Sequence, residues 1–166
     1  MKHGKVATEQ TSLIAPYFRC PDKTRQWELD ECLVRNADNP LIDRIILLID
    51  DGASLPLQSD QIDIRNLDTH PTYADWMSIT EDMQFQGPVL LANRDIYFDE
   101  TLKLVHQVLA EPSVFMALSR WEVESGSTRQ HPNPHWSQEV WAITAGQSDL
   151  CQIPERLGFK AGRPAL

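Results

Sequence analysis

Residues 89–102, VLLANRDIYFDETL, decide how we expect the chain to fold. Val89 to Ala92 form a short aliphatic run that follows the turn signal Gly87-Pro88, so they predict a buried strand. Polar residues begin directly afterwards, with the tripeptide 93–95. Ligand-binding groups gather at the carboxyl ends of strands in open α/β sheets. The stretch therefore predicts a strand with functional side chains at its carboxyl end.

The rest of the chain alternates between strand and helix patterns. The segment 44–50, RIILLID, is aliphatic throughout, which is typical of a strand covered on both faces. Further strands are predicted at 12–18, 61–67, 114–123 and 139–144, and helices at 22–36, at 72–83 and from 99 to 112. Strands that alternate with helices indicate βαβ units. The expected fold class is α/β, with a Rossmann-like, mostly parallel sheet flanked by helices.

The length of 166 residues fits one domain, residues 1–166. We expect residues 1–11 to be a flexible N-terminus and residues 145–166 to be an irregular C-terminal segment. Residues 125–136 are rich in Ser, Gly, Pro and Asn and predict a loop with little regular structure.

The composition of the chain limits the binding partners and the cellular location that we expect. The formal net charge is -9, and the sequence has no cluster of Lys and Arg, so we expect no nucleic-acid partner. We expect no membrane span, because no apolar run approaches about 18 residues, and we expect a cytoplasmic location. The three cysteines are widely spaced and form no Cys-x-x-Cys pair, which argues against a zinc site or a redox dithiol.

Six segments resemble, in order, the GT-A-type glycosyltransferase-like family of bacterial and viral nucleotide-diphospho-sugar transferase-like proteins. They are LIAPYF, RQWELDECLVRNADNPLIDRIILLID, THPTYADWM, LLANRDIYFDETL, ALSRW and SQEVW. The most specific is ANRDIYFDETL, which is similar to the family's Ala-Asn-Ser-Asp-Ile-Tyr-Phe-Asp stretch. The resemblance implies a GT-A-type nucleotide-sugar-binding fold in which an Asp-x-Asp-type motif holds a divalent metal against the donor diphosphate.

The chain departs from that family pattern in two places. Asn93 stands where the family motif has its first carboxylate. The chain also ends at Leu166, shortly after the segment 162–164, where similar family members continue into a polar stretch and a further helix. We therefore expect a C-terminally shortened relative of the family.

Asp95 is the candidate catalytic residue and metal ligand, because one or two carboxylates suit Mn²⁺ or Mg²⁺ beside a leaving diphosphate. Its alternative role is to cap the turn after the strand. Asn93 is a candidate substrate ligand in the same motif, and Arg94 either pairs with phosphate or faces solvent. Asp99 lies four residues further on, where capping the next helix is the favoured role.

Five other side chains are predicted to bind the nucleotide donor. Asp50 closes the strand at 44–50, where acidic residues contact ribose hydroxyls in doubly wound folds. Tyr17, Arg19 and Arg25 follow the first strand, where proteins of the resembled family hold the donor nucleotide. Asp75 could line the same pocket, although it belongs to a helix whose Tyr/Trp/Met stripe is more often part of a core.

The last strands add candidates for the sugar and the acceptor. Arg120 would suit a carboxylate or phosphate, and the Trp121 ring would suit the face of a sugar. The alternative is that this segment forms an edge-strand ion pair. Glu139 is the best remaining carboxylate for a general base in an inverting transfer. His131 and His135 have the i, i+4 spacing of zinc ligands, but the prolines between them prevent the helix that would align the two rings.

Three functions follow from these residues. The leading hypothesis is a glycosyltransferase that moves a sugar from a nucleotide-diphosphate donor to an unknown acceptor glycan or small molecule, with a divalent metal near Asp95. The alternative is a non-catalytic nucleotide-sugar-binding or scaffold module, which Asn93 and the short C-terminus favour. An aspartate-dependent phosphohydrolase built on Asp50 is disfavoured, because Gly52 occupies the position of the second aspartate.

Overall fold

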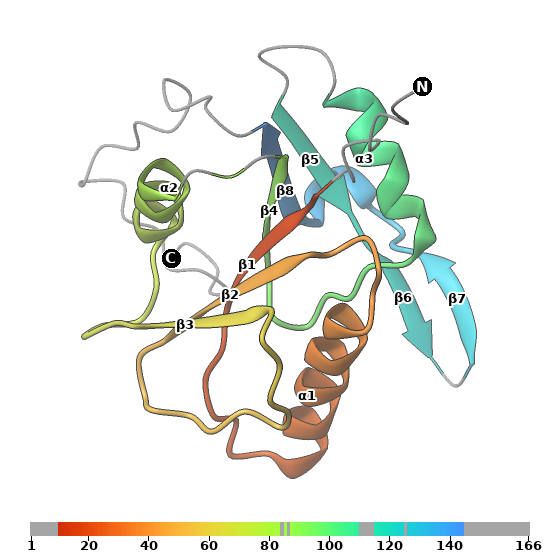
Figure 1. Ribbon diagram of the computed structural model, residues 1–166. Helices are drawn as coiled ribbons and strands as arrows, with labels where there is room; N and C mark the ends of the chain where they lie inside the picture. Colours follow the sequence, from red (N-terminus) through yellow and green to blue (C-terminus); the bar gives the residue numbers. More distant parts are fainter. Residues whose placement is uncertain (1–9, 84, 86, 110–114, 125, 145–166) are drawn as a thin grey trace, which may run out of the picture.

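A computed structural model describes residues 10–83, 85, 87–109, 115–124 and 126–144. Its centre is a six-stranded sheet with the strand order β3-β2-β1-β4-β8-β5, and a two-stranded ribbon, β6-β7, projects beside it (Figure 1). The strands are β1 (Ser12–Pro16), β2 (Arg44–Ile49), β3 (Ile62–Asn66), β4 (Pro88–Ala92), β5 (Phe115–Ser119), β6 (Trp121–Glu124), β7 (Ser127–Gln130) and β8 (Gln138–Thr144). The helices are α1 (Lys23–Ala37), α2 (Tyr73–Asp82) and α3 (Lys103–Val108), with 3₁₀ turns η1 (Glu100–Leu102) and η2 (Pro134–Trp136).

The sheet is mostly parallel, as the sequence predicts. β1 pairs in parallel with β2 and β4, and β2 pairs in parallel with β3. β8 is antiparallel to both of its neighbours, β4 and β5. The helices flank the sheet (Figure 1), so the prediction of an α/β, Rossmann-like architecture is confirmed.

Successive side chains of the central strands point to opposite faces of the sheet, and both faces are buried. Leu13 and Leu47 pack with residues of α1 and α3 in one core cluster. Their neighbours Ile14 and Ile46 pack with Trp76 and Met77 of α2 in a second cluster. One helix layer therefore covers each face, and the aliphatic run in β2 is explained by this double coverage.

The polar residues that begin the helices behave as caps. Asp22 accepts a hydrogen bond from the backbone N–H of Arg25 at the start of α1. Thr72 and Asp75 form a reciprocal capping box at the start of α2, and the Asp75 carboxylate accepts from the Thr72 backbone N–H at 2.7 Å. Asp75 thus has a helix-capping role, and its predicted contact with a substrate stays a prediction. Asp99 caps η1, its favoured role.

The structure also corrects two predicted segments in the C-terminal half of the chain. The strand predicted at 114–123 is divided at Arg120 into β5 and β6, and the pairing of β5 is irregular between Leu118 and Ser119. The loop predicted at 125–136 contains β7, which pairs with β6. An ion pair between Glu122 and Arg129 joins the two strands of this ribbon.

The exposure of two residues near the N-terminus adds detail. Trp27, on α1, has 65% of its surface exposed. Thr11, predicted in a flexible N-terminus, is buried and its backbone N–H donates to Asp43 at 3.0 Å. Residues 1–9 and 145–166 lie outside the described residues. In the described part of the chain, no helix has the length and apolarity that crossing a membrane requires.

Candidate functional site

Four side chains meet where the order of the sheet reverses. The chain passes from β1 outward to β2 and β3 and then returns to place β4 on the other side of β1. Ligands in open α/β sheets bind beside such a reversal, at the carboxyl ends of the strands. Here the loop after β1 brings Phe18, α1 brings Arg25, and the loop after β4 brings Arg94 and Asp95. We refer to these four residues as the switch-point cluster.

Asp95 is ion-paired within this cluster. Arg25 Nη2 lies 2.5 Å from Asp95 Oδ2, and Arg25 Nη1 lies 2.9 Å from Glu28 on the same helix. The two side chains of the Arg25–Asp95 pair are 45% and 32% exposed, respectively. The hydrogen bond to Glu28 is the main cause that raises the pKa of Arg25, and Asp95 adds to it. A cation therefore already stands beside the carboxylate predicted to bind a metal.

Arg94 is held against the loop after β1. Its guanidinium lies 3.2 Å from the centroid of the Phe18 ring, and its Nη1 donates to the Phe18 carbonyl oxygen at 2.6 Å. Burial lowers the pKa of Arg94. The Phe18 ring meets His70 edge-on at 5.2 Å, and His70 Nδ1 lies 3.2 Å from Asp50 Oδ2. The predicted residue Asp50 thus adjoins the cluster through His70.

Phe18 and His70 were not among the predicted site residues. Phe18 directly follows Tyr17 in the exit loop of the first strand, and His70 lies between the third strand and the next helix. Both positions are at the carboxyl edge of the sheet. Both residues lie in loops at this edge, and such loops often carry functional residues, so their positions after predicted strands could have identified them.

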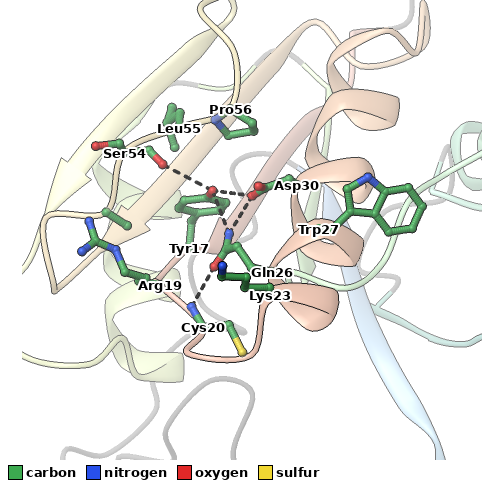
Figure 2. A pocket seen from close by; sticks show the side chains of 11 residues that line it. Tyr17, Arg19, Cys20, Lys23, Gln26, Trp27, Asp30, Ser54, Leu55 and Pro56 are labelled. Atoms are coloured by element: carbon green, nitrogen blue, oxygen red, sulfur yellow. Dashed lines mark hydrogen bonds between the residues drawn. The ribbon is translucent and has the colours of Figure 1, made fainter.

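Tyr17 and Arg19 line a pocket between α1 and the loop after β2 (Figure 2). Tyr17 is only 2% exposed, and its hydroxyl donates to Asp30 Oδ1 at 2.7 Å. Burial, with Asp30 adding, raises the pKa of Tyr17, so its side chain stays a neutral phenol. We call this space the α1 pocket; its lining residues are Tyr17, Arg19, Cys20, Lys23, Gln26, Trp27, Asp30, Ala53, Ser54, Leu55 and Pro56.

Glu139 forms the centre of a polar network at the start of β8. Its Oε2 accepts from Asn93 Nδ2 at 2.5 Å, and its Oε1 forms an ion pair with Arg120. The Ser137 hydroxyl donates to the same Oε1 at 3.2 Å. The Glu139 side chain is 17% exposed. The structure therefore joins three predicted residues, Asn93, Arg120 and Glu139, in one network.

Trp121 stands apart from the network. It is 64% exposed and lies on the β6-β7 ribbon, opposite Gln130. The residues predicted from the sequence are therefore divided among a cluster, a pocket and a network. Asp50 adjoins the cluster through His70, and Asp75 and Trp121 lie outside all three.

A metal ion at the switch point would need donor atoms from the side chains there. In the described residues, no three His, Cys, Asp or Glu side chains gather as a metal site. Asp95 offers one carboxylate, and Asn93 Oδ1 is a buried oxygen that accepts no hydrogen bond from the residues described. Mg²⁺ is commonly held by one or two carboxylates together with substrate phosphates. This donor set fits an ion that arrives with a phosphorylated ligand.

Comparisons with known proteins show where this architecture occurs. No protein-family model matches the chain. No curated protein matches it in sequence either. A solved structure of 4-diphosphocytidyl-2C-methyl-D-erythritol synthase from Anaerococcus prevotii matches with a TM-score of 0.61 and 14% identity, over 94% of this chain and 79% of that chain. The 2-C-methyl-D-erythritol 4-phosphate cytidylyltransferase of Francisella tularensis matches with a TM-score of 0.54 and 18% identity, over 86% and 77%. The chain therefore has the α/β, Rossmann-like fold of these nucleotidyltransferases, a fold related to the GT-A type.

Proposed function

We propose that the protein is a glycosyltransferase, which binds a nucleotide-diphosphate sugar at the switch-point cluster and transfers the sugar to an acceptor glycan or small molecule. The observation that carries the proposal is the convergence of Arg25, Arg94 and Asp95 where the sheet order reverses. The similarity in fold to two cytidylyltransferases supports a nucleotide-linked substrate. The GT-A resemblance of the stretch 92–102 supports sugar transfer.

The charges of the cluster suit a diphosphate. Arg25 and Arg94 supply cationic donors for its oxygens, and the partial burial of Arg94 strengthens such a contact. Asp95 would hold Mn²⁺ or Mg²⁺ together with Asn93 Oδ1, which accepts no hydrogen bond from the residues that the structure describes. When bound, the ion supplies positive charge that stabilises the departing diphosphate.

Other residues at the same edge complete the proposed assignment. Asp50, held by His70, is available to the hydroxyls of a ribose. Glu139 lies between Asn93 and Arg120, where the sugar and the acceptor would follow the diphosphate. Glu139 as general base stays a prediction. Its Oε2 accepts one hydrogen bond, from Asn93, and a carboxylate oxygen has a second lone pair that could take a proton.

The donor site is tested by titration calorimetry of a panel of nucleoside diphosphates, each with and without Mn²⁺. We expect one nucleotide to bind with a marked dependence on Mn²⁺, and Asp95→Asn to remove that dependence. The matched control is Asp63→Asn, because Asp63 pairs with Arg44 at 2.5 Å in an exposed ion pair at the amino ends of β2 and β3, at the opposite edge of the sheet from the cluster. Equal Mn²⁺ dependence in wild type and Asp95→Asn would refute the assignment of Asp95.

A non-catalytic nucleotide-sugar-binding module is the second candidate, and one observation favours it. Both oxygens of Glu139 accept from neighbouring side chains, so no unengaged base stands in this network. The two functions differ in donor turnover without acceptor. A transferase slowly releases free nucleoside diphosphate from its nucleotide sugar, whereas a binding module leaves the donor intact over the same incubation.

The structure does not favour the phosphohydrolase. The Asp51 carboxylate accepts from the backbone N–H groups of Arg19 at 2.7 Å and Ala53 at 3.0 Å, so it organises its own loop. Asp50 pairs with His70. A nucleophilic aspartate needs a second carboxyl group as its acid or base, and none of the described contacts supplies one to Asp50.

A further inference from the structure

Tyr73 is an aromatic residue at the carboxyl edge of the sheet that the proposed function leaves without a role. It is the first residue of α2 and directly follows the capping residue Thr72. The connection that leads to it leaves the carboxyl end of β3, and His70 in that connection contacts Phe18 of the switch-point cluster. Tyr73 therefore begins its helix on the side of the sheet where the proposed donor binds.

Two tryptophans fix the position of the Tyr73 ring. Its centroid lies 4.9 Å from that of Trp76 and 5.0 Å from that of Trp141, at interplanar angles of 84° and 87°. Edge-to-face packing of this kind is favourable between aromatic rings. Trp76 belongs to the same helix and is 0% exposed, whereas Trp141 belongs to β8. The ring is therefore held both by its own helix and by the sheet.

The face of the sheet against which Tyr73 packs also carries Glu139. Glu139 and Trp141 are two residues apart on β8, so their side chains point to the same face. Burial is the main cause that raises the pKa of Tyr73, and the negative charge of Glu139 adds to it. The second effect requires the carboxylate to lie near the phenol. Tyr73 thus presents a neutral O–H group beside Glu139.

The Tyr73 hydroxyl is an unused hydrogen-bond donor. In the part of the chain that the structure describes, it forms no hydrogen bond, although the residue is half-buried. The buried Tyr17, in contrast, donates its hydroxyl to Asp30 at 2.7 Å. A polar group removed in part from water without a partner carries an energetic cost. A fixed phenol in this state is suited to donate to a ligand.

Tyr73 and Glu139 together have the chemistry to recognise a neutral hydroxyl group. Glu139 Oε2 accepts one hydrogen bond, from Asn93, and keeps a second lone pair. A ligand hydroxyl is able to accept from Tyr73 and to donate to Glu139 at the same time. An ionised phosphate oxygen only accepts, and the carboxylate repels it. The pair therefore favours a sugar hydroxyl over a phosphate.

From this arrangement we infer that Tyr73 is a specificity-determining residue, which binds a hydroxyl of the donor sugar together with Glu139. The inference rests on the proposed function, because it places the sugar next to the diphosphate site. Asn93 connects the two places: its Nδ2 donates to Glu139 at 2.5 Å, and its Oδ1 is the proposed metal ligand. A sugar attached to the diphosphate follows the same path.

The first test compares nucleotide sugars with their nucleoside diphosphates by calorimetry in the presence of Mn²⁺. Tyr73→Phe keeps the ring and removes only an unpartnered hydroxyl, so the variant should melt at the wild-type temperature. It should weaken binding of the nucleotide sugar by about two- to tenfold and leave the nucleoside diphosphate unchanged. Tyr97→Phe is the matched control, because the Tyr97 ring lies beside Arg35 of α1, 4.6 Å from its guanidinium. Equal affinity of wild type and Tyr73→Phe for every nucleotide sugar would overturn the inference.

Deoxy analogues distinguish recognition of a hydroxyl from a structural role of Tyr73. Nucleotide sugars that each lack one ring hydroxyl are titrated into both proteins. One analogue should bind the wild type about two- to tenfold more weakly than its parent sugar, whereas Tyr73→Phe should bind the two equally. If Tyr73 served only the packing of α2, the variant would weaken all analogues alike and keep the wild-type discrimination. That result would contradict the inference.

A third measurement separates the inference from the proposed function. Free monosaccharides are screened against wild type and Tyr73→Phe by saturation-transfer NMR, without nucleotide. We expect at least one sugar to receive a signal from the wild type that Tyr73→Phe reduces. Absence of any Tyr73-dependent signal overturns the inference, even where a nucleoside diphosphate binds. If no nucleoside diphosphate binds, the proposed donor site fails, and the monosaccharide screen still decides the role of Tyr73.

Discussion

Replacing Arg25 with Gln should affect metal and nucleotide binding in opposite directions. In the free protein Arg25 Nη2 lies 2.5 Å from Asp95 Oδ2, so any cation that binds Asp95 competes with the guanidinium. Both side chains are substantially exposed, at 45% and 32%, and solvent screens their attraction. Exposed ion pairs of this kind contribute about 0.2–1 kcal/mol. Removing the guanidinium should therefore tighten Mn²⁺ binding by up to about fivefold.

The nucleotide should respond to the same substitution with the opposite sign. A charge-assisted hydrogen bond to phosphate contributes about 1.5–3 kcal/mol, so loss of Arg25 should weaken nucleoside diphosphate binding by at least about tenfold. Mn²⁺ affinity is measured from the paramagnetic resonance signal of the free ion, and nucleotide affinity by calorimetry. Arg44→Gln, which opens the matched ion pair with Asp63, is the control and should change neither value. Weaker Mn²⁺ binding in Arg25→Gln would refute this reasoning.

Three further predictions concern stability. Gly87→Ala should lower the Tm by several degrees, because the added Cβ would lie 1.9 Å from the Gln10 carbonyl oxygen; differential scanning calorimetry measures the change. Thr72→Ala removes the capping box of α2 and should cost about 1 kcal/mol in a urea titration. Thr101 lowers the pKa of Asp99, so Asp99 should stabilise the fold above its unfolded pKa of about 3.9 and lose that contribution as pH falls through its folded pKa. The stability difference between wild type and Asp99→Asn, measured in urea against pH, should shrink on acidification.

Local patterns predicted most of the fold because the forces that form these elements are local or periodic. The aliphatic run of 44–50 indicated a strand covered on both faces, and Asp22 and Thr72 indicated helix starts. The β6-β7 ribbon was missed, because its Ser- and Gly-containing sequence has the composition of a loop. Its pairing depends on cross-strand contacts such as the Glu122–Arg129 ion pair, which strand-by-strand patterns do not reveal.

The position of the candidate site was easier to predict than its internal contacts. Arg94 and Asp95 were identified because they follow a buried strand. Their partners come from another part of the chain: Asp95 pairs with Arg25, 70 residues away, and Arg94 donates to Phe18, 76 residues away. A strand pattern locates the edge of a sheet, but it does not specify which side chains reach across that edge.

Glu139 shows how strand direction decides which residues meet. It lies near the start of its strand, and in a parallel strand that position would be at the amino edge of the sheet, away from Asn93. β8 is antiparallel to β4, with Val140 opposite Ala92, so its first residues lie at the carboxyl ends of the parallel strands. The Asn93–Glu139 contact at 2.5 Å follows directly from this reversal. One antiparallel strand in a mostly parallel sheet therefore brings a partly buried carboxylate to the edge where Arg94 and Asp95 already lie.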